Sequence, residues 1–391
     1  MIRHLFTMIW NKKKKNFLMI TEIFVSFLVL FAIFSLIVFN INNYRKPAGF
    51  DYENVWAINF SLEDSKRDSM ANYHKPVENL LRSTPEVKDF SWTSENFPYS
   101  MSSSNNQVSY KKARVSAEIH HAGDSYHKVI GTNMVEGRWF QREDDGLKDQ
   151  VIVINEALKE ALFKDESPLG KIINADEHGG DKIIGVVATM KEKGDFQANE
   201  PSFYRRISTT DSNRYEHIVL IKLASEQGAE FEARLHKQLS KLLYGANIEI
   251  EYLAEMRKDR NNLTIVPVTI LLIISAFLVL NVSLGLFGIL WYNINSRKSE
   301  IGLRRAVGAT SNNISWHFIA EAMVLTTLAL TVGLFFAIQF PLLNVFDIAA
   351  GVYLSAILLS VLFIYVLVLI CAFYPGRQAA GIYPATALHE D

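Results

Sequence analysis

The 391-residue chain has a single cysteine, Cys371, which lies inside an apolar run. One thiol cannot form an internal disulfide, so the sequence excludes a small fold that depends on disulfides. Neither sign of charge is in excess, because the formal net charge is -1, and no nucleic-acid partner is expected. Any domain of this chain must therefore fold on its hydrophobic core alone.

Motifs for catalysis and for nucleotide binding are absent as well. The sequence contains neither the GxSxG motif of serine hydrolases nor the HExxH motif of zinc proteases. It also lacks GxxxxGK[ST], the loop that holds the phosphates of ATP. We therefore expect no enzymatic activity and no cofactor in this chain. If ATP drives it, another polypeptide must bind the ATP and its Mg²⁺.

One group of potential metal ligands occurs in the chain, and it consists of His120, His121, Asp124 and His127. On a strand, the two adjacent histidines would point to opposite faces of the sheet and are poor partners for one ion. We interpret the group as solvated or structural and predict no metal site there.

Long apolar runs are, by contrast, abundant. A helix needs roughly 20 apolar residues to cross about 30 Å of hydrocarbon. Four runs reach this length, and they cover residues 17–39, 263–290, 314–340 and 352–374. Their only formal charges are Glu22 and Glu321. The sequence therefore predicts an α-helical membrane protein with four transmembrane helices.

The first run follows four lysines at positions 12–15, as a cleaved signal peptide would. Its apolar length exceeds the roughly 7 to 15 residues of a signal-peptide core, so we interpret it as a retained anchor. Residues 1–16 are then a cytoplasmic segment. Apolar side chains at helical spacing in residues 1–11 predict an amphipathic helix in the membrane interface, and a frayed terminus is the alternative.

The distribution of lysine and arginine predicts the orientation, because these residues resist translocation in short loops. They occur before the first run and in residues 291–313, whereas residues 341–351 contain neither. Both termini, including the tail 375–391, are therefore predicted to be cytoplasmic. Residues 40–262 form a large exported domain, and the chain is expected to be a multi-pass protein of the bacterial inner membrane with this domain in the periplasm.

The exported segment alternates between strand and helix patterns, which predicts a mixed α/β domain. Strands are predicted at 55–60, 108–119, 150–154, 182–188, 217–222 and 248–252, and helices at 71–81, 155–163 and 226–243. Their order predicts a discontinuous part, about residues 50–110 and 205–255, with an inserted part at about 111–204.

The cytoplasmic loop predicts a short charged helix over residues 296–307. Glu300 and Arg304 stand at i,i+4, which favours an ion pair on one helix face. The apolar residues left to be buried are Ile301, Leu303 and Val307. Gly308 suits a left-handed C-cap, and Ser311 or Thr310 can cap the next helix. A cytoplasmic partner could push on this helix, and the alternative is a solvated loop that only sets topology.

Two ionisable residues, His317 and Glu321, stand at i,i+4 near the cytoplasmic end of the third run. Such groups are costly in a membrane unless they are paired or reach the interface. The sequence favours snorkelling of both side chains to the headgroups of membrane lipids. The alternative is a polar pair in the membrane, in which Glu321 positions the loop.

Several segments resemble MacB/FtsX-type ABC transporter permeases. SRKSEIGLRRAVGATSNNISWHFIAEAMVL resembles the hallmark segment of this family, and YPGRQAAGIYPATALHED resembles its ending. GTNMVEGRWFQRED, VIVINEALKEALF, PLGKII and IIGVVA resemble the MacB-like periplasmic core domain in the same order. Together these segments cover most of the chain, whereas residues 61–107 match weakly.

The resemblance implies a homodimer, or a heterodimer with a paralogous permease, above two ATP-binding subunits. It assigns contact with the ATPase to the loop helix, here Arg297, Glu300, Ile301, Leu303, Arg304, Arg305, Val307 and Gly308. MacB proper carries its nucleotide-binding domain ahead of the first span, whereas this chain begins with the anchor, so a separate ATPase subunit is expected. A periplasmic adaptor and an outer-membrane channel are further expected partners.

The resemblance also implies mechanotransmission, in which the ATPase moves the loop helix and thereby the exported domain. The second run, about 42 Å long as a helix, exceeds the bilayer and suits a stalk. The expected role is export or efflux of a peptide, a toxic compound or another envelope substrate. Lipoprotein release or control of a cell-wall enzyme would use the same machinery. A membrane-anchored sensor or scaffold is an alternative of another class, and the substrate cannot be identified from the sequence.

Overall fold

The computed structural model describes residues 13–61, 70–147, 149–164, 166–176, 179–207 and 217–380. The chain divides into two units, Met1–Asn42 with Ile265–Asp391, and Asn43–Thr264, and each has its own hydrophobic core. The amphipathic helix predicted for residues 1–11 and the end of the tail lie outside the described residues.

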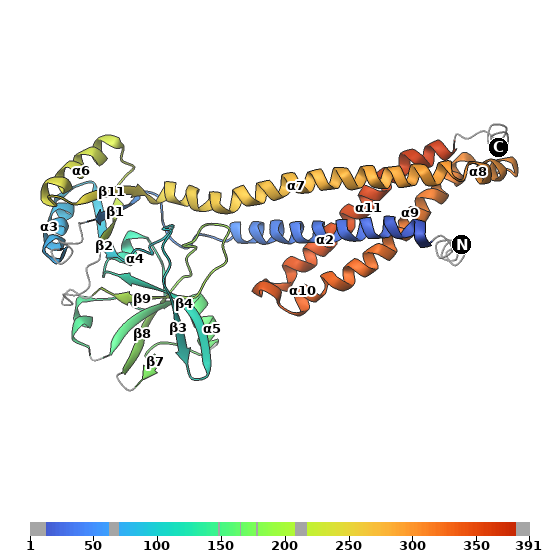
Figure 1. Ribbon diagram of the computed structural model, residues 1–391. Helices are drawn as coiled ribbons and strands as arrows, with labels where there is room; N and C mark the ends of the chain where they lie inside the picture. Colours follow the sequence, from blue (N-terminus) through green and yellow to red (C-terminus); the bar gives the residue numbers. More distant parts are fainter. Residues whose placement is uncertain are drawn as a thin grey trace. The chain divides into compact units, whose positions relative to one another are not determined.

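The first unit is helical among its described residues (Figure 1). The long helices are α2 (Lys13–Tyr44), α7 (Leu253–Asn295), α9 (Ser311–Ala337) and α11 (Ala350–Ala380). Short elements connect them, namely α8 (Lys298–Ala306), α10 (Gln339–Leu342) and the 3-10 turn η3 (Val345–Asp347). Each long helix contains a window apolar enough to cross a membrane, which confirms the prediction of four apolar helices.

Side chains of all four long helices form one apolar core. Phe27 and Phe31 of α2 are buried in it, and the Phe31 ring lies edge-on to Phe340. A Cβ atom on Gly333 of α9 would lie 2.5 Å from Cδ1 of Phe27, so a larger residue would force the two helices apart. Outside this core, α7 exposes large apolar side chains such as Ile273 and Phe277. Such an apolar surface suits a hydrocarbon environment rather than water.

Helix α7 is longer than the sequence predicted. It begins at Leu253, directly after the last strand, and not at residue 263. Its 43 residues correspond to about 64 Å, roughly twice the thickness of the hydrocarbon core. Its first turns carry charged residues such as Arg257 and Asp259, which a search for apolar runs excludes. The apolar run therefore marks only part of this helix, and the bounds 263–290 of the second transmembrane segment stay a prediction.

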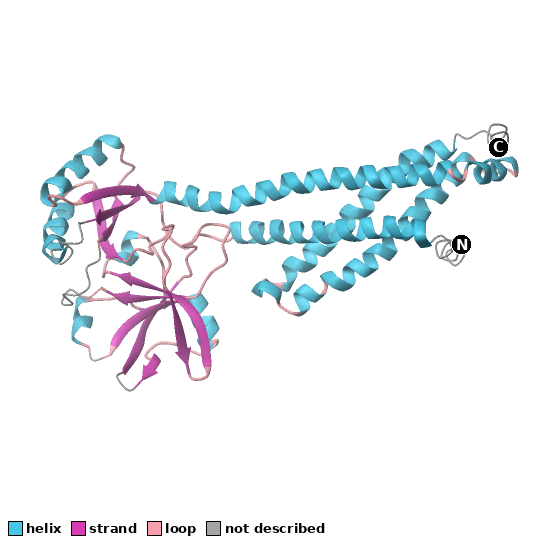
Figure 2. Cartoon of the chain, viewed as in Figure 1, coloured by secondary structure: helices cyan, strands magenta, loops and turns pink. Residues whose placement is uncertain are grey.

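The second unit contains an 11-stranded mixed sheet (Figure 2). Its strand order is β11-β1-β10-β2-β4-β9-β6-β8-β5, with β3 paired to β4 and β7 paired to β8. The strands are β1 (Val55–Ser61), β2 (Val87–Thr93), β3 (Asn105–Tyr110), β4 (Ala113–Ala122), β5 (Met134–Gly137), β6 (Gln150–Asn155), β7 (Ile172–Asp176), β8 (Gly179–Val187), β9 (Ser202–Arg206), β10 (Ile218–Leu223) and β11 (Asn247–Tyr252).

Two halves of this sheet meet at one residue pair, Thr93 of β2 opposite Ala122 of β4. The half with β11, β1, β10 and β2 is antiparallel and carries α3 (Met70–Ser83) and α6 (Ala229–Leu242). The other half contains the parallel pairs β4 with β9 and β6 with β8, and it carries α5 (Glu156–Phe163). The short elements α4 (Tyr126–Val129) and η2 (Arg142–Gly146) complete the domain. The predicted part boundaries at about 110 and 205 stay predictions.

Strand β10 is buried on both faces. Val219 and Ile221 face the core that α3 and α6 cover, whereas Ile218 and Leu220 face a second core. Successive side chains point to opposite faces, so a strand covered on both sides reads as a continuous apolar run. This pattern explains why the strand at 217–222 was predictable.

The strand region predicted at 108–119 contains two strands. The segment forms a hairpin in which β3 pairs antiparallel with β4, with Tyr110 opposite Ala113. Lys111 turns the chain with a left-handed φ of 54°. Left-handed turn positions usually hold glycine or asparagine, so two lysines gave no turn signal. The helices predicted at 71–81, 155–163 and 226–243 are confirmed as α3, α5 and α6.

Candidate functional site

The cytoplasmic loop of the sequence prediction contains the short helix α8, one turn from the end of α7. It ends before Gly308, whose left-handed φ of 102° agrees with the predicted C-cap. Thr310 then caps α9, since its hydroxyl accepts a hydrogen bond from the backbone N–H of Asn313 at 3.3 Å. Of the two predicted capping residues, Thr310 therefore takes the role.

Arg297 ties α8 to α9. Its Nε donates to Glu300 at 2.8 Å, its Nη1 donates to Glu321 at 2.8 Å, and its guanidinium lies 5.2 Å from the ring centre of Phe318. Burial alone would lower the pKa of Arg297, but the hydrogen bond to Glu300 and the charge of Glu321 raise it above its ordinary value. The side chain is therefore a buried, fully charged link between the loop and the start of the third span.

A second ion pair and one apolar side chain fix α8 further. Arg304 lies 2.6 Å from Glu300, as the i,i+4 spacing predicted. Ile301 is buried in a small cluster with Ile294 of α7 and Ile314 of α9. The loop helix is thus packed against both neighbouring helices, which a loosely solvated loop would not be.

Two predicted core residues of the loop lie at the surface instead. Leu303 is 58% exposed and Val307 is 82% exposed, although both were expected to be buried. A nine-residue helix that packs through one side can bury only one narrow stripe, and Ile301 occupies it. Arg305 is half-buried, lies on the side of the helix that carries Ile301 four residues earlier, and donates to Ser311. The exposed surface at the end of α8 is therefore apolar.

Glu321 has a different partner from the one that the sequence predicted. Its carboxylate accepts from Arg297, and no hydrogen bond joins it to His317 among the described residues. The ring of His317 instead lies edge-on to Phe318, with centroids 6.1 Å apart. The guanidinium reaches Glu321 from the loop, so the carboxylate does position the loop, but through an arginine that the i,i+4 pattern did not reveal.

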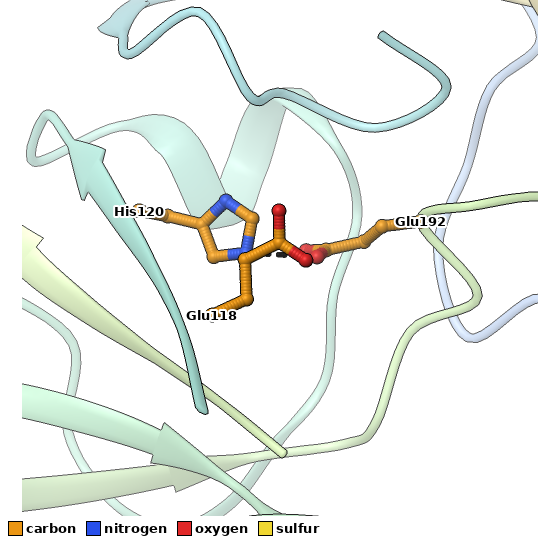
Figure 3. Close-up of side chains that lie close together, drawn as sticks. All are labelled: Glu118, His120 and Glu192. Carbon is orange, nitrogen blue, oxygen red and sulfur yellow. Dashed lines mark ion pairs between the residues drawn. The ribbon is translucent and has the colours of Figure 1, made fainter. Parts of the chain in front are cut away.

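A buried polar cluster lies in the exported domain, at the end of β4 (Figure 3). Glu118 and His120 are two residues apart on this strand and so point to one face of the sheet. They are 4% and 1% exposed. Glu192, on the β8–β9 loop (residues 188–201), reaches the same place, and its Oε2 lies 2.8 Å from Nε2 of His120.

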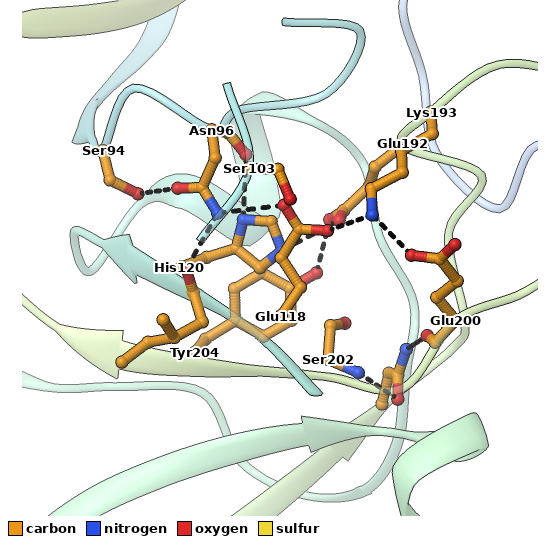
Figure 4. Close-up of polar contacts among 12 residues, drawn as sticks. Ser94, Asn96, Ser103, Glu118, His120, Glu192, Lys193, Glu200, Ser202 and Tyr204 are labelled. Carbon is orange, nitrogen blue, oxygen red and sulfur yellow. Dashed lines mark hydrogen bonds and ion pairs between the residues drawn. The ribbon is translucent and has the colours of Figure 1, made fainter. Parts of the chain in front are cut away.

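Further polar groups surround these three side chains (Figure 4). The backbone oxygen of Asn96 lies 3.0 Å from Nδ1 of His120, and the hydroxyl of Tyr204 donates to Glu192 at 2.8 Å. The ammonium of Lys193 lies 2.9 Å from Glu118 and 2.5 Å from Glu200. Every charged group of the cluster thus has an opposite charge beside it, as buried ions require.

The protonation states follow from these contacts. Burial alone would lower the pKa of His120, but the charge of Glu192 raises it above its ordinary value. Burial alone would raise the pKa of Glu118, but the hydrogen bond from Lys193 and the charge of His120 bring it below its ordinary value. The surrounding charges thus favour the protonated form of His120 and the ionised form of Glu118.

The structure does not gather the four residues of the histidine-rich segment 120–127 around one point. Asp124 accepts from Nε of Arg206 at 2.7 Å, and the ring of His127 lies against Trp139 with centroids 5.3 Å apart. His120 meets Glu118 and Glu192 instead, two residues that sequence reasoning missed. The spacing Glu-x-His on one predicted strand could have indicated Glu118. No sequence pattern near His120 indicates Glu192.

The β8–β9 loop also holds the end of α2. Lys191 is 2% exposed, and its ammonium donates to the backbone oxygens of Asn43, Lys46 and Asp195, the last two at 2.6 and 3.1 Å. Asn43 returns a hydrogen bond to the backbone oxygen of Phe196 at 3.1 Å. A lysine at the C-terminal carbonyls of a helix stabilises both the helix end and its attachment.

The same loop holds the first turns of α7. Asp195 lies 2.6 Å from Nη2 of Arg257 and accepts from Nδ2 of Asn261 at 2.8 Å. Its own backbone N–H donates to Oδ1 of Asn261 at 2.9 Å. One loop of the exported domain therefore contacts the end of the helix that enters the domain and the start of the helix that leaves it.

Comparison with known protein families assigns both units of the chain. Residues 17–238 match the family described as the MacB-like periplasmic core domain. Residues 272–384 match the FtsX-like permease C-terminal family. The two matches follow each other along the chain without overlap.

Curated relatives include two proteins named macrolide export ATP-binding/permease protein MacB. That of Aggregatibacter actinomycetemcomitans is 28% identical over 239 residues, which cover 60% of this chain and 37% of the relative. That of Neisseria gonorrhoeae is 24% identical over 311 residues, which cover 74% and 46%. The chain thus spans less than half the length of these relatives. The crystal structure of the periplasmic region of MacB from Actinobacillus actinomycetemcomitans aligns with a TM-score of 0.39 at 19% identity, over 56% of this chain and 98% of that one.

Proposed function

The chain belongs to the MacB/FtsX-type family of ABC transporter permeases, and on this basis we propose that it transmits ATP-driven movement from a cytoplasmic ATPase to its periplasmic domain. As a member of this family it is an inner-membrane protein with four apolar helices and a periplasmic domain. The proposed movement serves export of an envelope substrate. ATP and Mg²⁺ would bind to an ATPase outside these 391 residues, which contain no phosphate-binding loop.

The surface of α8 carries this proposal. Arg297 and Ile301 hold the helix to its neighbours, so a force on α8 reaches the spans instead of bending a loose loop. Leu303 and Val307 remain exposed, although a soluble surface gains nothing from two adjacent apolar side chains. An ATPase that covered them would bury apolar area in the centre of an interface.

The route from α8 to the periplasmic domain supports the same proposal. Helix α7 runs from Leu253 to Asn295, and no residue separates it from β11 at one end. The β8–β9 loop binds its first turns through Asp195 and binds the end of α2 through Lys191. Movement of either helix would therefore act on the sheet through buried charged groups. A dimer, with a second copy or a paralogous permease, would use this arrangement twice.

Purification of the full chain from its native membrane tests the docking surface. Val307→Asp places a charge on the exposed patch without touching the ion pairs of Arg297. We expect about tenfold or greater loss of co-purifying ATP-binding subunit and of ATP hydrolysis, because truncating a hot-spot residue costs about 2 kcal/mol or more and about 1.4 kcal/mol already corresponds to tenfold. Tyr244→Asp is the matched control, since Tyr244 is an exposed aromatic residue of the periplasmic domain. Equal ATPase recovery with both variants would contradict the proposal.

The substrate class requires a separate experiment. The curated relatives are named for macrolide export, so macrolides are the first class to test. We expect a deletion strain to become more sensitive to macrolides, and the intact chain but not Val307→Asp to restore resistance. Unchanged sensitivity together with lipoproteins retained in the inner membrane would favour lipoprotein release by the same machinery. Unchanged sensitivity with altered cell-wall hydrolysis would favour control of a cell-wall enzyme.

A further inference from the structure

Three side chains of the periplasmic domain present a set of metal ligands. His120 offers one imidazole nitrogen, and Glu118 and Glu192 each offer a carboxylate oxygen, with all three atoms within 4.8 Å of one another (Figure 3). We propose that these residues bind one divalent first-row transition ion, for which Zn²⁺ is the probe. Nitrogen from histidine and oxygen from carboxylates are ligand types that such ions accept, and three protein ligands leave room for water.

The surroundings of His120 fix the atom that would bind. Its Nδ1 lies 3.0 Å from the backbone oxygen of Asn96, which places a proton on Nδ1 in the neutral ring and directs the Nε2 lone pair at the carboxylates. Nε2 is buried and makes no hydrogen bond of good geometry among the described residues, although Glu192 lies 2.8 Å away. A backbone carbonyl behind the distal nitrogen is the usual arrangement around a metal-binding histidine.

The carboxylates are held in the same way. The hydroxyl of Tyr204 donates to one oxygen of Glu192 at 2.8 Å and leaves the other oxygen directed at His120. Nδ2 of Asn96 lies 3.4 Å from one oxygen of Glu118. Outer hydrogen bonds of this kind orient metal ligands and reduce the entropy that binding would otherwise cost.

A divalent ion between Nε2 of His120 and the carboxylates of Glu118 and Glu192 would offset the negative charges of both. Glu118 is buried and Glu192 is largely buried. Negative charge in a medium of low dielectric constant is costly unless it is compensated.

Two of the three proposed ligands line a pocket. A small pocket at this place is lined by Glu118, Glu192, Lys193 and Glu200, among others. Lys193 contacts both Glu118 and Glu200, so it can release Glu118 to an ion and keep its contact with Glu200 (Figure 4). Its ammonium is the group that an arriving cation would displace.

Binding would change how the periplasmic domain is connected. Two ligands belong to β4 and the third to the β8–β9 loop. Glu192 follows Lys191, which holds the end of α2. A bound ion would therefore fasten to the sheet the loop that joins the helices to the domain. The inference concerns binding alone and does not depend on which substrate the protein exports.

Metal titration of the full chain in detergent tests this site, after removal of any affinity tag and treatment with a chelator. We expect one Zn²⁺ per chain, measured by competition with a chelating indicator and by metal analysis after gel filtration. His120→Gln and the isosteric Glu192→Gln should each weaken binding by at least about tenfold. His236→Gln removes an exposed histidine of α6 and should leave the affinity unchanged.

X-ray absorption of the Zn²⁺-loaded wild-type chain gives a readout that does not require the variants to fold. One imidazole with oxygen donors and no sulfur is expected. Two or more imidazoles, wild-type affinity in a folded His120→Gln chain, or a folded wild-type chain that retains no stoichiometric ion would each overturn the assignment.

Discussion

At the scale of single residues, Asp144 shows how one buried carboxylate organises a turn. Both its oxygens accept from Arg138, at 2.8 and 2.6 Å, and one also accepts from the backbone N–H of Gln141 at 2.8 Å. The hydrogen bond from Arg138 lowers the pKa of Asp144 below its ordinary value, against the opposing effect of burial. The carboxylate thus stabilises the folded domain only while it is ionised.

Asp144→Asn should therefore destabilise the periplasmic domain in a pH-dependent way. Charge-assisted hydrogen bonds contribute about 1.5 to 3 kcal/mol, so we expect a lower unfolding temperature at pH 7. In the unfolded chain an aspartate has a pKa of about 3.9, and in the folded domain the pKa of Asp144 is lower. The stabilisation is therefore fully present above the unfolded-state pKa and is lost as the pH falls through the folded-state pKa. The difference between wild type and variant should accordingly shrink in acid.

Tryptophan fluorescence during thermal unfolding measures this difference. Asp259→Asn is the control, because Asp259 is exposed, and it should change the unfolding temperature little at any pH. A gap between wild type and Asp144→Asn that stays constant down to pH 3 would contradict the ionic origin of the stabilisation.

Glu321 is the residue at which the link between loop and span can be cut with least disturbance. Glu321→Gln keeps the shape of the side chain and removes the charge that faces Arg297. We expect the ATP-binding subunit to remain bound, since Val307 is untouched, while export falls because α8 moves without α9. Glu22→Gln alters the other carboxylate within the apolar runs, which lies beside Gly285, and serves as the control. Loss of ATPase binding in Glu321→Gln would show that the residue shapes the docking surface itself.

The residue scale also shows which contacts a sequence can predict. The pair Glu300–Arg304 was predictable because helical geometry fixes the distance between residues four apart. The contacts Arg297–Glu321 and His120–Glu192 were not, because the two partners belong to different elements. The distance between such partners depends on how the two elements pack against each other. Spacing along the sequence does not predict this packing.

At the scale of elements, the β8–β9 loop has no regular secondary structure but contains a buried, charged lysine that binds backbone oxygens. Lys191 offers its charge to three backbone oxygens within a buried site. Only a rigid loop can hold a lysine in this way, since the cost of burying an unpaired ammonium is several kcal/mol. This role could not be predicted from the sequence, because a lysine in a segment without helix or strand pattern usually lies in solvent.

Lys191→Met should free the end of α2 while the sheet stays folded. The variant keeps the length of the side chain but leaves the oxygens of Asn43 and Lys46 without their donor. Amide hydrogen exchange in residues 43–46 should become at least about tenfold faster, which corresponds to a decrease of about 1.4 kcal/mol in the free energy of local opening. The exchange rates of the β10 amides should not change. Lys237→Met, at an exposed position of α6, should exchange like the wild type. Equal protection of residues 43–46 in both variants would rule out the lysine as the anchor.

At the scale of the whole molecule, hydropathy alone predicted the division into apolar helices and a polar domain. The long runs require no packing information, because each must satisfy its own backbone hydrogen bonds in the membrane. The sheet was less predictable. Its two halves meet where the ends of β2 and β4 pair at Thr93 and Ala122, and β3, β5 and β7 are short or exposed strands without a clear alternation.

The orientation of the chain remains to be measured, and its single cysteine makes the measurement simple. In a Cys371→Ser background, a cysteine at Tyr244 or at Val307 would be the only thiol, and both positions are more than 80% exposed. We expect a membrane-impermeant maleimide to label the first in intact spheroplasts and the second only after permeabilisation. Labelling of position 307 in intact cells would reverse the proposed topology.

The direct junction between Tyr252 of β11 and Leu253 of α7 has a further consequence, which concerns angular phase. One residue added to an α-helix turns everything beyond it by about 100°, and four added residues bring it back to within about 40° of the original direction. Inserting alanines at this junction would thus rotate the periplasmic strand around the helix axis while changing its height by only a few ångströms. Activity that is lost with one or two added alanines and restored with four would show that function depends on the rotational position of α7 about its axis and not on the length of the helix.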